Sequence, residues 1–293
     1  MQNAMRIAMM SGKRGPKPPA YGGLCFTAEA DNSSVQLTAV DSAPAVTLVK
    51  SFDGVNWEAY AVGEVIDLLS VGDFVYLAAG EGGNNAFGAS ASAYHKFVIN
   101  GLVAASGDIT SLRRFDLEQT TLANFCYACM FEGCTGLTSA PELPATTLAT
   151  GCYRQMFRGC TGLTSAPELP ATTLANVCYQ YMFSGCTGLT SAPELPATTL
   201  AINCYAYMFE GCTGLTSAPE LPATTLARAS CIFMFSGCTN LSLIKVRFTA
   251  WRSHTNSWVN GVSPTGTFYK PSALPAEYGT AKIPTGWTVV NID

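Results

Sequence analysis

Apolar residues recur with a fixed period of 26 through the middle of the chain. The string GCTGLTSAPELPATTLA occurs four times without a change, at 133–149, 159–175, 185–201 and 211–227. A Met-Phe pair precedes each copy, and a fifth copy begins at Gly237 and then diverges. Such self-similarity is typical of proteins whose units cannot bury their apolar side alone and share one core by stacking. The pattern therefore predicts five stacked units with degenerate ends.

The first part of each unit is predicted to be a helix. Leu148, Cys152 and Met156 recur at intervals of four, and a second apolar row follows one position later. Rows of apolar residues spaced in this way form one face of a helix. A threonine before the rows can cap the helix, and Gly159 stands where a left-handed residue would end it.

The second part of each unit is too rich in proline and glycine for another helix. Residues 163–166 read as a short strand, and Pro167 and Pro170 force an extended return to the next unit. Parallel strands would place one leucine per unit in a ladder with a spacing of about 4.8 Å. The expected fold class is an α/β repeat: a leucine-rich-repeat-like solenoid with 26-residue units, preceded by a small β-sandwich domain.

The flanking segments carry other patterns. Residues 21–106 contain short β-prone runs separated by turn signals, which predicts a β-sandwich anchoring domain with a flexible loop at 81–93. The solenoid is expected over 107–245, and the aromatic-rich segment 246–293 is expected to cap its open end. Residues 1–20, rich in glycine and proline, are expected to form a flexible basic arm.

Charge divides the chain unevenly. The arm carries four basic residues and no acid, whereas the remaining residues have a net charge of −8. The basic residues are Arg6, Lys13, Arg14 and Lys17. An acidic body argues against nucleic-acid binding, which needs a basic face. We expect the arm to become ordered on an acidic partner, and the alternative is a disordered end.

Only 12% of the residues are charged, about half the usual share, so recognition would rest on shape and hydrogen bonds. No run approaches the 18 apolar residues of a membrane span. The apolar run Ile7–Met10 is too short for the core of a signal peptide, so we expect a soluble protein without an export signal.

Candidate chemistry is sparse. Eleven of the 12 cysteines lie in the repeat region, spread along it rather than converging in fours, which favours free buried thiols over a zinc site. One glutamate per string forms a column that could attract Ca²⁺ or, as we prefer, splay apart in solvent. The two histidines, His95 and His254, lie far apart, and no catalytic spacing is recognisable. We expect no enzymatic activity, cofactor or metal.

The repeat itself carries a resemblance. The pattern MFxGCTGLTSAPELPATTLAxxCYxxMF resembles the BspA-like leucine-rich-repeat surface proteins of gut bacteria and their phages. It covers about 106–250, and the segments WVNGVSPTGTFYKP and IPTGWTVVN resemble the C-terminal tail of that family. The resemblance implies surface adhesion or attachment to host molecules. The lack of an export signal departs from the bacterial members and fits a phage structural protein assembled in the cytoplasm.

Positions that differ between otherwise identical units mark a candidate ligand-binding face. Arg154, Arg158, Tyr181 and Tyr207 occupy such positions, and most of these positions lie off the buried rows of the predicted helix. Tyrosine and arginine supply large contact areas at low entropic cost. The alternative interpretation is relaxed constraint on a solvated face.

These observations predict a non-enzymatic binding or attachment protein on a virion surface. Its arm and β-sandwich would anchor it to other virion or surface-assembly proteins, and its solenoid would bind a host cell-surface protein or glycan. The alternatives are an architectural virion decoration or fibre protein, and a bacterial cell-surface adhesin. Formation of a homo-oligomer is compatible with the sequence.

Overall fold

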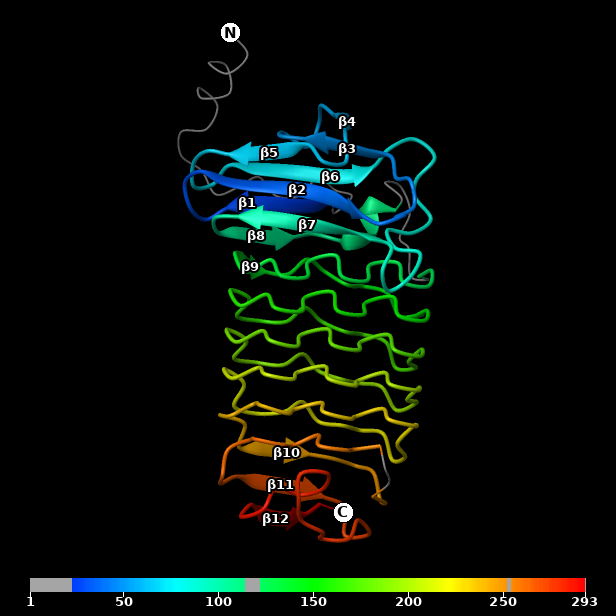
Figure 1. The fold of residues 1–293 in the computed structure, drawn as a ribbon, viewed down its shortest axis with the longest axis vertical. Coiled ribbons are helices and arrows are strands. Elements are labelled where there is room, and N and C mark those ends of the chain that lie inside the picture. Colours follow the sequence, from blue (N-terminus) through cyan, green and yellow to red (C-terminus); the bar gives the residue numbers. More distant parts are fainter. Residues whose placement is uncertain (1–22, 114–121, 252–253, 293) are drawn as a thin grey trace.

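The computed structural model describes residues 23–113, 122–251 and 254–292. A β-rich region forms one end of an elongated molecule, irregular coils lie below it in successive layers, and a small sheet lies at the C-terminal end (Figure 1). The arm residues Arg6, Lys13, Arg14 and Lys17 lie outside the described residues.

The β-rich region consists of two antiparallel sheets that share a core. One sheet has the strand order β4-β3-β6-β1-β8 and continues into β9 of the repeat region, and the other has the order β5-β2-β7. The strands are β1 (Leu24–Ala28), β2 (Ser33–Val40), β3 (Leu48–Ser51), β4 (Glu58–Tyr60), β5 (Val65–Leu68), β6 (Phe74–Ala79), β7 (Tyr94–Asn100), β8 (Val103–Ser106) and β9 (Leu137–Ser139). The buried rings of Phe26 and Phe97, from different sheets, meet with their centroids 4.8 Å apart.

The predicted α/β solenoid is wrong. The described residues contain no α-helix, and their one helical element is a short 3₁₀ helix, η1 (Ile109–Leu112). The return segments form no continuous sheet along the repeats either. Successive return segments are joined by isolated parallel bridges such as Ser165 to Ser191 and Thr173 to Thr199. Pro167 has no N–H group to donate, which limits such pairing.

The predicted helix is instead a run of turns. The N–H groups of Arg154 and Met156 donate to carbonyl oxygens three residues back, at 3.1 and 3.2 Å. Those of Tyr153 and Phe157 donate to carbonyl oxygens 25 residues further on, in the next unit, at 3.1 and 2.9 Å. In an α-helix every N–H group would instead bond four residues back within the same segment. Alternate amides therefore close turns and join units.

The apolar spacing misled the helix prediction because both structures place every fourth residue on the same side. Four residues of an α-helix turn through about 400°, so such rows drift around the helix. The turns have a four-residue repeat without drift, since φ is positive at Gly151, Gln155 and Gly159. Only glycine enters this left-handed region freely, so the glutamine is a departure that sequence reasoning does not anticipate.

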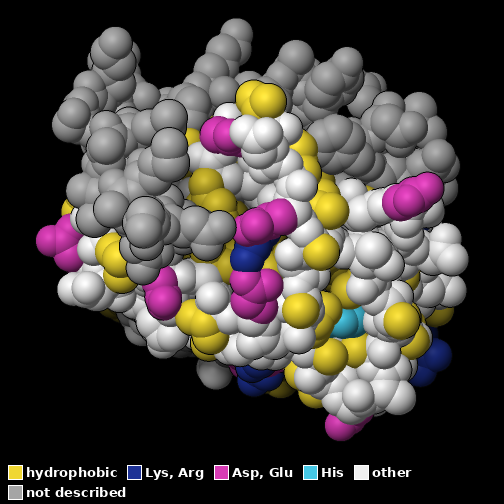
Figure 2. Space-filling view, turned by 90° about the horizontal axis from the view of Figure 1, so that it is seen from above, with side chains coloured by type: hydrophobic (Ala, Val, Ile, Leu, Met, Phe, Trp, Pro, Cys, Tyr) yellow, Lys and Arg dark blue, Asp and Glu magenta, His cyan; other side chains and the backbone are white. Residues whose placement is uncertain are grey.

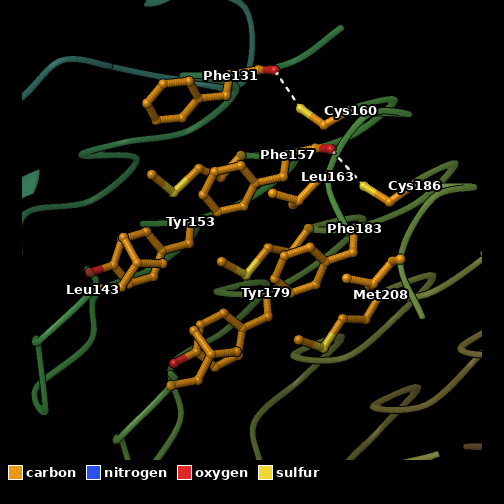
Figure 3. Close-up of a cluster of buried hydrophobic side chains, with 14 of the residues drawn as sticks. Phe131, Leu143, Tyr153, Phe157, Cys160, Leu163, Tyr179, Phe183, Cys186 and Met208 are labelled. Carbon is orange, nitrogen blue, oxygen red and sulfur yellow. Dashed lines mark hydrogen bonds between the residues drawn. The ribbon is translucent and has the colours of Figure 1, made fainter. Parts of the chain in front are cut away.

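Side chains of one kind lie above one another through the repeat stack, which we define as residues 122–251. The phenylalanine column has centroid spacings of 5.4 to 5.7 Å from Phe131 to Phe235. The tyrosine column has spacings of 5.9 to 6.2 Å from Tyr127 to Tyr205. Figure 3 shows members of both columns beside buried leucine and methionine side chains. The apolar columns expected from the sequence are buried.

One cysteine per unit forms a hydrogen bond between layers. The thiols of Cys160, Cys186 and Cys212 each donate to the carbonyl oxygen of the phenylalanine 29 residues earlier, at 3.0 Å. Figure 3 marks the bonds of Cys160 and Cys186. Burial raises the pKa of Cys186 to about 12, so this thiol keeps its proton at neutral pH. All 12 cysteines are buried and free.

The β-rich region continues the columns of the repeat stack. The ring of Phe97 lies 5.1 Å from that of Phe131, and the ring of Phe87 lies 6.2 Å from that of Tyr127. The Cys134 thiol donates to the carbonyl oxygen of Phe97 at 3.1 Å, as its counterparts do within the stack. The β-rich region thus serves as the first layer on which the repeats pack.

The segment 81–93, predicted as a flexible loop, is tied to this junction. Phe87 is buried, and its N–H group donates to the carbonyl oxygen of Cys126 at 2.9 Å. The Asn84 side chain accepts from the N–H group of Thr47 at 2.8 Å and donates to the carbonyl oxygen of Leu112 at 2.8 Å. The Phe87 bond joins this segment to the repeats, and the Asn84 bonds fix it within the β-rich region.

Tryptophans close the C-terminal end. A parallel sheet joins β10 (Leu243–Lys245), β11 (Thr267–Lys270) and β12 (Thr288–Asn291). The Trp258 ring lies 6.1 Å from that of Phe235, and its indole N–H group donates to the Lys282 carbonyl oxygen at 2.8 Å. No helix in the described parts of the chain is long and apolar enough to cross a membrane.

Candidate recognition face on the turns of the repeat

The variable positions of the repeats lie on the turn side of the stack. Residues at every fourth position have positive φ, and one such column runs from Cys129 through Gln155 to Tyr181, Tyr207 and Phe233. The backbone bonds of these turns do not involve side chains, so the residues in this column can differ without disturbing the fold. We call the outward-facing residues of these turns the variable face.

Three aromatic rings stack along this face. The centroids of Tyr181 and Tyr207 lie 4.3 Å apart with an interplanar angle of 12°. Those of Tyr207 and Phe233 lie 4.8 Å apart with an angle of 4°. The guanidinium carbon of Arg158 lies 5.8 Å from the centroid of Tyr181. The three rings, which we call the aromatic row, are each partly exposed.

Charged and polar residues flank the aromatic row. Arg158 pairs with Glu132 at 3.1 Å, so its charge is partly neutralised. In the neighbouring column the Nε atom of Arg154 donates to the Gln180 side chain at 3.0 Å. On the other side the Ser184 hydroxyl donates to the Glu210 carboxylate at 3.3 Å. The face therefore combines apolar edges with donors and acceptors and has little net charge.

The structure brings together the four residues that the sequence proposed for this face. Arg158 and Tyr181 lie in adjacent layers, Tyr207 follows, and Arg154 lies in the neighbouring column. Phe233 was not among these four residues, although its position also varies between units and follows Tyr207 by one repeat period of 26. Its position in the repeat was enough to predict that it lies beside Tyr207, because residues one period apart lie in the same column.

Stacking limits what the aromatic row can bind. Each ring face within the row is covered by the next ring, so a ligand meets ring edges and the tyrosine hydroxyls. Partial burial and the neighbouring Tyr207 raise the pKa of Tyr181, and its hydroxyl therefore remains a donor at neutral pH. Such a surface can recognise a polar ligand through hydrogen bonds and apolar edges.

Other candidate sites do not converge. The carboxylates of Glu142, Glu168 and Glu194 are exposed, whereas Glu220 pairs with both Lys245 at 2.7 Å and Arg247 at 2.6 Å. No group of three or more metal-ligating side chains occurs in the parts of the chain that the structure describes. His95 is buried beside the carbonyl oxygen of Phe87, and burial lowers its pKa.

Comparisons of this chain with protein-family models, with curated proteins and with solved structures found no match. The resemblance to BspA-like proteins therefore stays a prediction that rests on the repeat motif.

Proposed function

We propose that this protein is a non-enzymatic binding protein that attaches a larger assembly to a host cell-surface protein or glycan. The supporting observation is the continuous row formed by Arg158, Tyr181, Tyr207 and Phe233 on four successive layers. These positions vary where the rest of the unit is repeated without change. A binding surface can be varied in this way because the stack beneath it is unaffected.

The assembly that we favour is a virion, in which the β-rich end faces the particle and the repeat stack presents its variable face outward. An architectural decoration or fibre role, and display as an adhesin on a bacterial surface, are the alternatives. Tyrosine and arginine are enriched at energetically important contacts, which favours recognition over a purely architectural role. No enzymatic activity is expected of this protein.

The test is binding of the full chain to intact bacterial cells and to a glycan array. We expect Tyr181→Ala with Tyr207→Ala to weaken binding at least about tenfold, as loss of two central contacts does. A matched control is Thr172→Ala with Thr198→Ala, because both threonines are exposed on the return side of the units.

Equal binding by both double variants would contradict recognition through the variable face. The absence of binding by the unmodified chain, together with incorporation into particles, would favour the architectural role. Thermal melting of both variants checks that the stack is intact, and Arg158→Ala supplies a second probe that leaves the rings in place.

A further inference from the structure

Four turns lie together at one end of the strands of the β-rich region. They join β1 to β2 (29–32), β3 to β4 (52–57), β5 to β6 (69–73) and β7 to β8 (101–102). The N–H group of Glu29 donates to the carbonyl oxygen of Leu102 at 2.8 Å, and that of Asn32 donates to the carbonyl oxygen of Leu69 at 3.0 Å. Three of the turns are therefore fixed directly against one another.

The fourth turn leaves the same end of the sheet, because Ser51 pairs with Tyr76 near the start of β6. The side-chain oxygens of Asp31 and Asp53 hold the turns further. Asp31 accepts from the N–H group of Val71 at 3.0 Å, and Asp53 accepts from that of Val55 at 2.8 Å. These turns form a preorganised surface.

This surface exposes large aliphatic side chains. Val55, Leu69, Val71 and Leu102 are 77, 62, 63 and 47% exposed, and we call these four residues the turn patch. Single exposed aliphatic residues are ordinary, but a group of them in interlocked turns marks an interaction site. A partner that covers the patch would remove this apolar surface from water.

The four turns themselves carry negative charge only, and Lys50 beside them, 6.0 Å from the centroid of the Phe52 ring, is paired with Glu58 and Glu64. The four turns contain Glu29, Asp31, Asp53 and Asp73 and no lysine, arginine or histidine, and the exposed Asp67 precedes Leu69. Figure 2 shows apolar and acidic side chains side by side on the end of the molecule formed by the β-rich region, with a basic group enclosed between acidic side chains. The partner must therefore offer apolar residues together with positive charge.

One segment of this chain has that composition. Residues 1–20 carry four basic residues and no acid, and the apolar run Ile7–Met10 stands between Arg6 and Lys13. The chain enters β1 at Leu24, at the opposite end of this strand from the turn patch, which is about 17 Å for five extended residues. To reach the turn patch of its own copy, the segment would have to turn back along the length of β1. A second copy can present the segment to the turn patch without this reversal of the chain.

We propose that the turn patch binds residues 1–20 of a second copy of this protein. The two surfaces differ, so each copy has both a donor segment and an acceptor patch, and the contact can extend from copy to copy. Part of the attraction is between opposite charges at the protein surface, and salt must weaken it. This inference is independent of the ligand-binding role proposed for the variable face.

Sedimentation velocity of the full chain tests the proposal over a range of protein concentrations at low and high salt. We expect self-association that high salt weakens. Leu69→Ser with Val71→Ser should abolish it, whereas Val65→Ser should not, because Val65 is a 51% exposed aliphatic residue on β5 outside the four turns. Circular dichroism melts establish that each variant is folded.

A charge exchange identifies the partner segment. Glu29→Lys with Asp67→Lys should weaken self-association at least about tenfold at low salt, and Lys13→Glu with Arg14→Glu should do the same. A mixture of the two double variants should associate, because the reversed patch then meets the reversed segment. A chain that stays monomeric, or association that is unchanged by these substitutions, would overturn the proposal.

Discussion

The two halves of each repeat unit are held together in different ways. In the turn half, such as residues 149–160, alternate N–H groups donate to the next unit. In the return half, such as residues 161–174, hydrogen bonds between units are fewer and isolated bridges take the place of a sheet. Among the four exact copies, the units differ in sequence in the turn half, and the return half is repeated without change.

This difference shows which part of the unit depends on particular side chains. Backbone bonds form whatever the side chain, so the turn half can vary at its outward positions. Its inward positions still carry the buried phenylalanine and tyrosine columns. The return half depends on leucines that fill the core and, in addition, on prolines that fix its path and glycines that allow close approach. A Cβ atom on Gly188 would lie 2.4 Å from the carbonyl oxygen of Thr161 in the preceding unit. The following predictions test this contrast.

The largest effect is expected in the shared core of the turn half. Phe183→Ala removes a buried ring from the middle of the phenylalanine column and should lower the free energy of unfolding by about 3 to 5 kcal/mol. Leu189→Ala, the matching core change in the return half, should cost about 2 to 5 kcal/mol. Denaturant unfolding measures both, and a loss below about 1 kcal/mol at either position would mean that the columns do not carry the stack.

Close packing in the return half predicts the next effect. Gly188→Ala should cost about 2 to 4 kcal/mol, because its new methyl group meets backbone that cannot rotate away. Gly185→Ala is the matched control: the nearest atoms to its Cβ lie at 3.7 Å, and only its φ of 75° is unfavourable, at about 1 kcal/mol. Equal losses in a thermal melt would contradict the contact with Thr161.

A smaller effect concerns a polar atom inside the stack. The Tyr179 hydroxyl is buried without a hydrogen-bond partner, whereas that of Tyr127 donates to the carbonyl oxygen of Ile109 at 3.4 Å. Tyr179→Phe should therefore raise the free energy of unfolding by about 1 kcal/mol, and Tyr127→Phe should lower it by about 0.5 to 1 kcal/mol. Chemical denaturation of the two variants measures both changes. A lower free energy of unfolding for Tyr179→Phe would contradict the prediction and would indicate an internal water bound to the Tyr179 hydroxyl.

The smallest effect is expected at an ion pair on the return side. Hydrogen bonds from Lys245 and Arg247 lower the pKa of Glu220 below its ordinary value of 4.5. The charged carboxylate therefore stabilises the fold above that value, and this stabilisation is lost as the pH falls through the lowered pKa. Glu220→Gln should cost at most about 0.5 kcal/mol at neutral pH, because the pair is partly exposed.

The control for this change is Glu194→Gln, since Glu194 is exposed and occupies the same position one unit earlier. Unfolding of both variants at pH 7 and pH 3 gives the comparison. The difference between them should shrink at the lower pH, and a difference that grows on acidification would contradict the assigned ion pairs.

Much of the variable face could be predicted from the repeat alone. Residues one period apart lie in one column, so Tyr181 and Tyr207 had to be neighbours once the units stacked. The contact of Arg158 with the Tyr181 ring was not accessible, because Arg158 belongs to another column and only the folded structure shows which ring its side chain reaches. The turn patch was equally hidden, since its four turns are distant in sequence and are joined by strand pairing.

The sequence by itself determined the 26-residue period, the identity of the apolar columns and the separation of a variable from an invariant half. Those features follow from which side chains avoid water, and the pattern can be recognised in the sequence because it is repeated. Only the tertiary structure decided between a helix and a run of turns. The reason is that residues such as Cys152 and Met156 are buried in either case, and the choice lies in whether amides bond within one unit or to the next. That choice exists only when the neighbouring unit is in place.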